Sequence, residues 1–260
     1  MATQQKSQAA SSAASASDQG PIGFVFSMLF GAVFTTLFSW VLSIGIELAG
    51  MHFFWQERGV LHSRDLVMEE LGYISAAPHS VIVSNTVPFS HALVAQVAAP
   101  FVKLGVMGFY VRSKAAYDAA QASAPSAVGK AGVGNTLKLT AAQGNLMLAS
   151  LGVVAMYTAQ DTALRLAIVV FALPAFLLAC LLGAVDGLMR RDLRKWGGGR
   201  ESSFVYHHAK ATTYLALGGG FALYLAWPTG GFNPAYMVLV FTALVAWSLS
   251  LTLSSFKKYL

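Results

Sequence analysis

Long hydrophobic segments without charged residues alternate with polar connections along this chain. The first covers 22–46, and three more cover 166–185, 211–227 and 236–253. About 20 consecutive apolar residues are enough for a helix to span a bilayer. The pattern therefore predicts an all-α, polytopic helical membrane protein with four transmembrane helices and a helical external region.

Two weaker hydrophobic segments leave the number of spans open. Residues 141–158 are apolar enough to insert, whereas residues 92–111 are interrupted by Pro100 and Lys103. Insertion of both segments would give six spans. A lysine near the middle of the bilayer costs ~2.5–3.5 kcal/mol on insertion scales, which favours four.

The polar loop 186–210 orients the chain in the membrane. It holds six basic residues against three acidic ones. Short loops rich in Lys and Arg are retained in the cytoplasm, so this loop is predicted to lie inside. Counting outward from it places the Pro- and Gly-rich turn 228–234 outside and both termini in the cytoplasm.

The same counting divides the chain into four regions. Residues 1–20 consist mainly of Ala, Ser and Gln and are expected to form a disordered cytoplasmic tail. Residues 22–46 form an uncleaved anchor, and residues 47–165 form an external, periplasmic and mostly helical region. Residues 166–256 form a three-helix membrane domain that contains the basic loop.

A short amphipathic helix is predicted within the external region. It would begin at Ser63 as a cap and stop at Gly72, because these residue types favour helix starts and ends. Leu66, Val67 and Leu71 would form its apolar face.

Composition supports the membrane prediction and excludes other classes. The chain is 56% hydrophobic and 11% charged, whereas soluble domains carry roughly 25% charged residues. Its net charge of +6 arises largely from six of 17 basic residues in one loop. Membrane orientation explains this excess, so we expect no direct contact with nucleic acid.

The sequence lacks a recognisable catalytic or metal-binding motif. Its histidines are His52, His62, His79, His91, His207 and His208. Adjacent histidines on a helix point about 100° apart, and no His-Glu-x-x-His pattern occurs. The serines in the spans have no Gly-x-Ser-x-Gly context. We therefore predict a protein that is not an enzyme and has no catalytic residues, no metal and no cofactor.

Two other functions stay open, each with a structural signature. A small membrane transporter or channel would have buried ionisable residues facing one another. A periplasmic enzyme would have carboxylates and histidines within hydrogen-bond reach in a cleft.

Glycines in the membrane domain are candidates for helix packing. Gly183 and Gly187 form a Gly-x-x-x-Gly spacing, and Gly219 lies in the next span. Small residues allow membrane helices to approach closely. The contact is expected within this chain, with a partner's helices, or in a homo-oligomer.

The basic loop has more structure than orientation requires. Residues 190–196 are predicted to continue the preceding helix, the glycines at 197–199 to end it, and Ser202 or Ser203 to start another helix. Contact with anionic lipid headgroups is one interpretation; docking of a cytoplasmic protein is the other. The candidate docking residues are Arg190, Arg191, Arg194, Trp196, Gly198, Arg200, Glu201, Tyr206 and His207.

The run 185–210 closely resembles the signature of a membrane protein family encoded by integrating conjugative elements, a domain of unknown function. Residues 57–73 and the pair Leu173-Pro174 resemble that family too, and the resemblance covers residues from about 22 to 258. It implies a non-enzymatic component of the bacterial inner membrane in a conjugative DNA-transfer apparatus, a type IV secretion system. The family's genes tend to lie beside that of the coupling ATPase, which makes this ATPase or another secretion-channel protein the expected partner. No catalytic residue is carried over.

Overall fold

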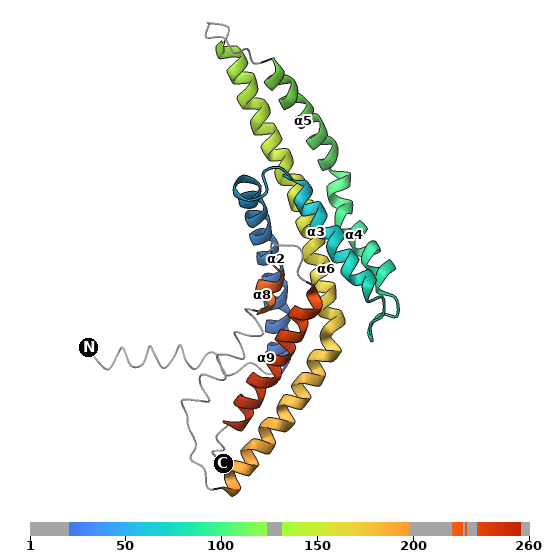
Figure 1. Ribbon diagram of the computed structural model, residues 1–260, viewed down its shortest axis with the longest axis vertical. Coiled ribbons are helices and arrows are strands. Elements are labelled where there is room, and N and C mark those ends of the chain that lie inside the picture. Colours follow the sequence, from blue (N-terminus) through green and yellow to red (C-terminus); the bar gives the residue numbers. More distant parts are fainter. Residues whose placement is uncertain (1–20, 124–131, 198–219, 226, 228–232, 256–260) are drawn as a thin grey trace, which may run out of the picture. The chain divides into compact units, whose positions relative to one another are not determined.

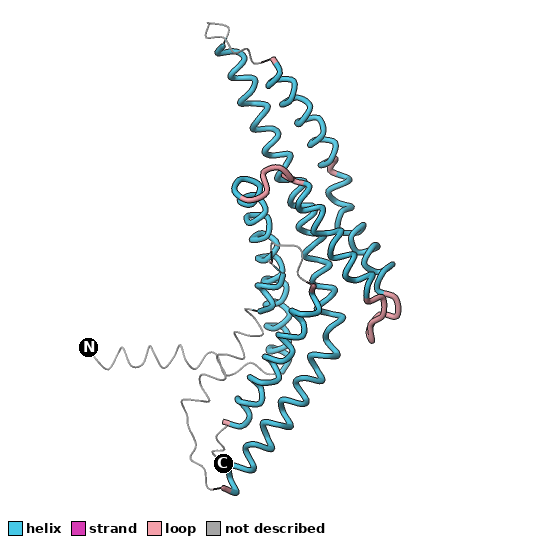
Figure 2. The backbone as a smooth tube through the Cα atoms, viewed as in Figure 1, coloured by secondary structure: helices cyan, strands magenta, loops and turns pink. Residues whose placement is uncertain are grey.

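The computed structural model describes residues 21–123, 132–197, 220–225, 227 and 233–255 (Figure 1). All regular secondary structure in these ranges is helical (Figure 2), which confirms the predicted all-α class. The chain divides into two compact units, Met1–Phe38 and Ser39–Leu260. The tertiary contacts below lie within the second unit.

The described part of the chain forms one very long helix and several shorter ones. The elements are α2 (Pro21–Phe53), α3 (Leu61–Ala76), α4 (Thr86–Lys103), α5 (Val106–Ala122), α6 (Gly132–Trp196), α8 (Gly220–Leu225) and α9 (Pro234–Ser254).

Three helices of the described residues are long and apolar enough to cross a membrane, namely α2, α6 and α9. They contain the predicted segments 22–46, 166–185 and 236–253. The bent pair of α4 and α5 would count as a fourth if it formed one span. The predicted segment 211–227 falls mostly outside the described residues. The fold is thus compatible with a polytopic membrane protein.

Helix α6 is 65 residues long and continues through Pro174. At 1.5 Å per residue it measures roughly 97 Å, about three times the thickness of the hydrocarbon core. The six-span alternative requires the chain to turn back between residues 158 and 166, so that 141–158 and 166–185 form two antiparallel spans. In the structure both segments lie in one continuous helix. The boundary predicted at residue 165 falls inside this helix.

The other helices of this unit pack along α6 (Figure 1). Helix α9 lies along its C-terminal half, α5 along its N-terminal part, and α3 and α4 against its middle. Two apolar clusters hold the middle together. They consist of Val60, Val153 and Val154 in one case, and Val67, Ile74 and Leu164 in the other.

Helix α3 exists where the sequence predicts a helix, but both predicted ends are wrong. The helix begins two residues before Ser63, and its N-cap makes no side-chain hydrogen bond. It continues through Gly72, which is exposed, because the next turn buries Ile74 in the core. Leu66 and Val67 are buried, as predicted for the apolar face.

Gly183 and Gly187 lie where α6 meets the backbone of α9. A Cβ atom added at Gly187 would lie 2.7 Å from the carbonyl oxygen of Ser250, and one at Gly183 would lie 3.0 Å from the Cα of Ala246. Only a residue without a side chain permits this approach. The third candidate, Gly219, lies outside the described residues.

Candidate functional site

The described part of the predicted docking element is the C-terminal end of α6. Arg190, Arg191, Arg194 and Trp196 lie on its last two turns, and the Trp196 side chain is 89% exposed. The helix ends at Trp196, immediately before the predicted glycine break. The remaining candidates, Gly198, Arg200, Glu201, Tyr206 and His207, lie outside the described residues.

A polar contact fixes this end of α6 to α9. The Arg190 Nε lies 2.9 Å from Asp186 Oδ2, and Ser250 Oγ donates a hydrogen bond of 2.5 Å to the same carboxylate oxygen. Asp186 therefore neutralises one of the basic residues and joins two helices. Arg190 therefore takes part in an ion pair within the protein, whereas the Trp196 side chain is exposed.

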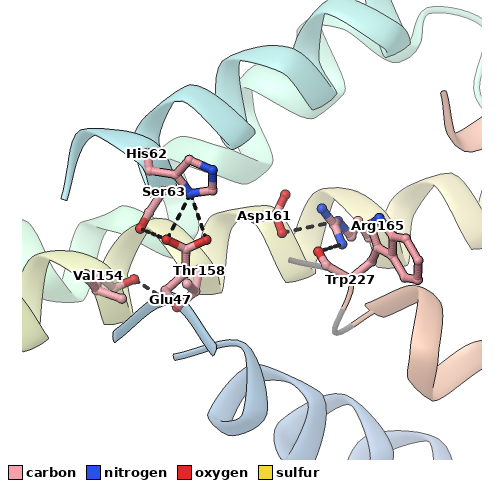
Figure 3. A network of polar contacts seen from close by, with 8 residues as sticks. All are labelled: Glu47, His62, Ser63, Val154, Thr158, Asp161, Arg165 and Trp227. Atoms are coloured by element: carbon pink, nitrogen blue, oxygen red, sulfur yellow. Dashed lines mark hydrogen bonds and ion pairs between the residues drawn. The ribbon is translucent and has the colours of Figure 1, made fainter. Parts of the chain in front are cut away.

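The structure also contains a buried charge cluster that sequence reasoning missed, and Figure 3 shows two of its members, Asp161 and Arg165. We call Glu70 of α3 with Asp161 and Arg165 of α6 the α3–α6 charge cluster. Arg165 Nε lies 3.1 Å from Asp161 Oδ2 (Figure 3). The same nitrogen lies 3.2 Å from Glu70 Oε1. The three side chains are between 2% and 8% exposed. A second nitrogen of the guanidinium, Nη1, donates to the backbone carbonyls of Tyr224, at 3.2 Å, and Trp227.

The cluster has one positive group for two carboxylates. Arg165 Nε is close to both acids but is not aligned for a hydrogen bond to either, so the attraction is mainly between charges. Within the described residues, Glu70 Oε2 and Asp161 Oδ1 have no hydrogen-bond partner. Burial raises the pKa of Glu70 from 4.5 to about 7, although Arg165 opposes the increase. Glu70 therefore holds a proton up to nearly neutral pH.

This pKa predicts that stability falls as the pH rises. Because the pKa of Glu70 is about 7 in the folded protein and 4.5 without burial, the folded state binds this proton more tightly than the unfolded chain. The contribution is complete below pH 4.5 and is lost as the pH rises to about 7. A shift of this size corresponds to roughly 3 kcal/mol.

Thermal unfolding in detergent, compared between about pH 5 and about pH 8, measures this loss. Glu70→Gln keeps the shape and stays neutral, so it should weaken the dependence, whereas Glu57→Gln removes an exposed carboxylate and should not. An unchanged pH dependence in Glu70→Gln would contradict the assignment.

A second polar contact joins α2 to α3. His62 Nδ1 lies 3.1 Å from both carboxylate oxygens of Glu47, and Ser63 Oγ donates to Glu47 Oε2 at 3.0 Å (Figure 3). The ring of Trp55 stacks on that of His62, with centroids 4.1 Å apart. Glu47 is only 1% exposed, so these donors replace the water that it loses.

The hydrogen bonds of Glu47, His62 and Ser63 differ from those of a Ser-His-Asp catalytic triad. In a Ser-His-Asp hydrolase the nucleophilic serine donates to histidine, whereas Ser63 donates directly to Glu47. Trp55 and His62 line an open hollow of about 580 Å³, but Ser63 does not line it and is 1% exposed. Among the described residues, no group of three or more His, Cys, Asp or Glu is arranged to hold a metal ion.

One local signal could have revealed part of the charge cluster. Asp161 and Arg165 are four residues apart, a spacing that brings side chains together on one helix face. The signal requires that the helix continue through this polar stretch. Glu47 and Glu70 lie on other helices, and no local spacing connects them with their partners.

The comparisons with known proteins agree with the family resemblance of the run 185–210. No curated protein and no solved structure matches the chain significantly. A family model described as "IncC plasmid conjugative DNA transfer protein DtrJ-like" matches residues 54–257. The match covers both the buried charge cluster and the basic loop, and it confirms the resemblance to a conjugative-element protein. The chain belongs to the DtrJ-like family of conjugative DNA transfer proteins.

Proposed function

We propose that this protein is a non-enzymatic inner-membrane component of a conjugative type IV secretion apparatus, where it acts as a scaffold that assists the coupling ATPase. The observation that carries the proposal is the basic C-terminal end of α6. One helix continues from an apolar segment into a basic surface that ends in the exposed Trp196. Exposed aromatic and arginine side chains are typical of protein docking sites. Membership of a conjugative DNA transfer family supplies the context.

The proposed orientation has both termini and the loop 186–210 in the cytoplasm. Arg191, Arg194 and Lys195 then lie at the height of anionic headgroups, which attract basic residues next to a span. Lipid contact and protein docking are compatible, because Trp196 projects from the end of the same helix. The remaining signature residues follow directly in the chain.

Recovery of the coupling ATPase with the full-length membrane protein tests the docking role. The combined substitution Arg194→Ala, Trp196→Ala, Arg200→Ala, Tyr206→Ala and His207→Ala removes the charged and aromatic side chains of the proposed surface. Loss of one docking hot spot costs more than about 1.4 kcal/mol, which is roughly tenfold in affinity. We therefore expect at least this decrease in recovery.

Arg112→Ala with Lys114→Ala is the matched control, because it removes two exposed basic residues from α5, in the predicted external region. This variant should recover the ATPase as wild type does. Equal recovery by the loop variant and wild type would exclude docking through this surface.

A small transporter or channel is the second candidate function, and the α3–α6 charge cluster favours it. Buried ionisable groups that face one another are typical of ion and proton pathways. In this protein, however, the guanidinium is held by two carboxylates and by the carbonyl groups of Tyr224 and Trp227. These fixed partners support a structural role. Ion or proton flux through vesicles that contain the purified protein would favour transport instead.

A further inference from the structure

An uncharged stretch of 32 residues, Leu71 to Val102, lies within the region that topology places outside the membrane. Glu70 precedes it and Lys103 follows it. The stretch contains the end of α3, the turn 77–85, and all of α4 except its last residue. A stretch of this length without a single Asp, Glu, Lys or Arg is unusual on a water-exposed surface.

Contacts along α6 give the depth of the hairpin that α3 and α4 form. Helix α3 runs in the same direction as α6, because Val60 packs with Val153 near its start and Ile74 packs with Leu164 near its end. The turn therefore lies beyond the level of Leu164, on the side of the apolar segment 166–185.

Helix α4 returns along α6 in the opposite direction. The ring of Phe89 lies 5.7 Å from that of Phe171, and Val106, just after α4, lies against Gly152. Helix α4 thus leads away from the segment 166–185 toward the N-terminal part of α6. For this reason α4 and α5 together do not form a span beside that segment. The bend of 57° between them is a change of direction outside the predicted hydrocarbon segment.

Phe171 lies five residues inside the segment 166–185, or about 8 Å along the helix. The turn lies farther along α6 than this contact. In a hydrocarbon core about 30 Å thick, that depth corresponds to the outer leaflet.

The turn has exposed apolar side chains and internal hydrogen bonds that suit such a position. Val81 is 89% exposed and Ile82 is 48% exposed, so apolar side chains project away from the protein. Thr86 N–H donates to Pro78 O, and Ser80 N–H donates to Val83 O. A backbone in hydrocarbon must satisfy its polar groups internally, and these bonds meet part of that requirement at the turn.

We propose that the α3–α4 hairpin is a re-entrant element whose turn, residues 77–85, inserts among the acyl chains of the outer leaflet. The inference rests on the membrane placement of residues 166–185 in the proposed function. The α3–α6 charge cluster then lies just above the point where the hairpin enters, and it fixes α3 to α6.

Spin-label accessibility in vesicles of phosphatidylcholine and phosphatidylglycerol tests the proposal on the full chain. Cys180→Ser removes the only cysteine, and a single cysteine is then introduced at Ile82, Val81, Leu177 or Met147. Leu177 and Met147 are exposed positions of α6, inside the predicted span and well outside it. Oxygen concentrates in hydrocarbon and a charged nickel reagent in water.

We expect the ratio of oxygen to nickel accessibility at Ile82 and Val81 to be several-fold higher than at Met147 and close to that at Leu177. Ratios at Ile82 and Val81 that equal the Met147 value, with Leu177 in lipid, would overturn the hairpin proposal alone. A water-like ratio at Leu177 would overturn the membrane placement on which both proposals rest. Because all four positions are exposed, the label displaces no core residue.

Discussion

Replacement of Arg165 by leucine is expected to reduce the free energy of unfolding by about 3–5 kcal/mol, the usual cost of removing one partner from a buried ion pair. The substitution would leave Glu70 and Asp161 facing each other in the core without a counter-charge. It would also remove the donor to the carbonyl groups of Tyr224 and Trp227, which ties α6 to α8 and the residue beyond it.

Thermal unfolding of the detergent-solubilised protein, followed by tryptophan fluorescence, measures this effect. Arg112→Leu removes an exposed arginine and should change stability by no more than about 0.5 kcal/mol. The triple variant Arg165→Leu, Glu70→Leu and Asp161→Leu removes all three charges and should regain much of the loss, because apolar residues often replace a buried ionic triad without cost. Arg165→Leu as stable as Arg112→Leu would show that the cluster contributes nothing.

Substitution of Gly183 by leucine is expected to displace α9 from α6 and to destabilise the membrane domain by about 1–3 kcal/mol, as overpacking of a close contact does. The atoms that a new side chain would meet belong to the backbone of Ala246, so they cannot rotate away. The same argument applies to Gly187 against Ser250.

Gly144→Leu is the control on the same helix, because nothing lies within 4 Å of a Cβ atom at this position. Thermal unfolding should separate the two variants, and a cysteine pair between α6 and α9 should cross-link less readily after Gly183→Leu. Equal tolerance of leucine at positions 183 and 144 would mean that the close contact does not stabilise the domain.

The parts of the fold that sequence predicts are those determined by local hydropathy. The segments 22–46 and 236–253 are uninterrupted apolar runs, and both lie in helices of the structure. The continuity of α6 was not predicted, because the external region was expected to end at residue 165 and the span to begin at residue 166. In the structure these two charges neutralise each other across one helical turn, so the helix continues through them.

The sequence gives less information about the site, because its contacts join distant positions. Glu70 meets Arg165 only once α3 packs on α6, and Glu47 meets Ser63 only once α2 turns back to α3. Ser63 illustrates the error that follows. Its residue type suits a helix cap, but tertiary contact assigns its hydroxyl to a buried carboxylate instead.

The length of α6 has a mechanical consequence. If α6 crosses the bilayer as proposed, this uninterrupted helix of 65 residues acts as a lever with the membrane as its fulcrum. Tipping such a rod by roughly 10° moves an end that lies about 30 Å from the pivot, as Trp196 does from the middle of 166–185, by about 5 Å, given a rise of 1.5 Å per residue. In the proposed orientation, a force applied to the external α5–α6 hairpin would thus reposition the basic end that carries Trp196, because α6 is continuous between the two.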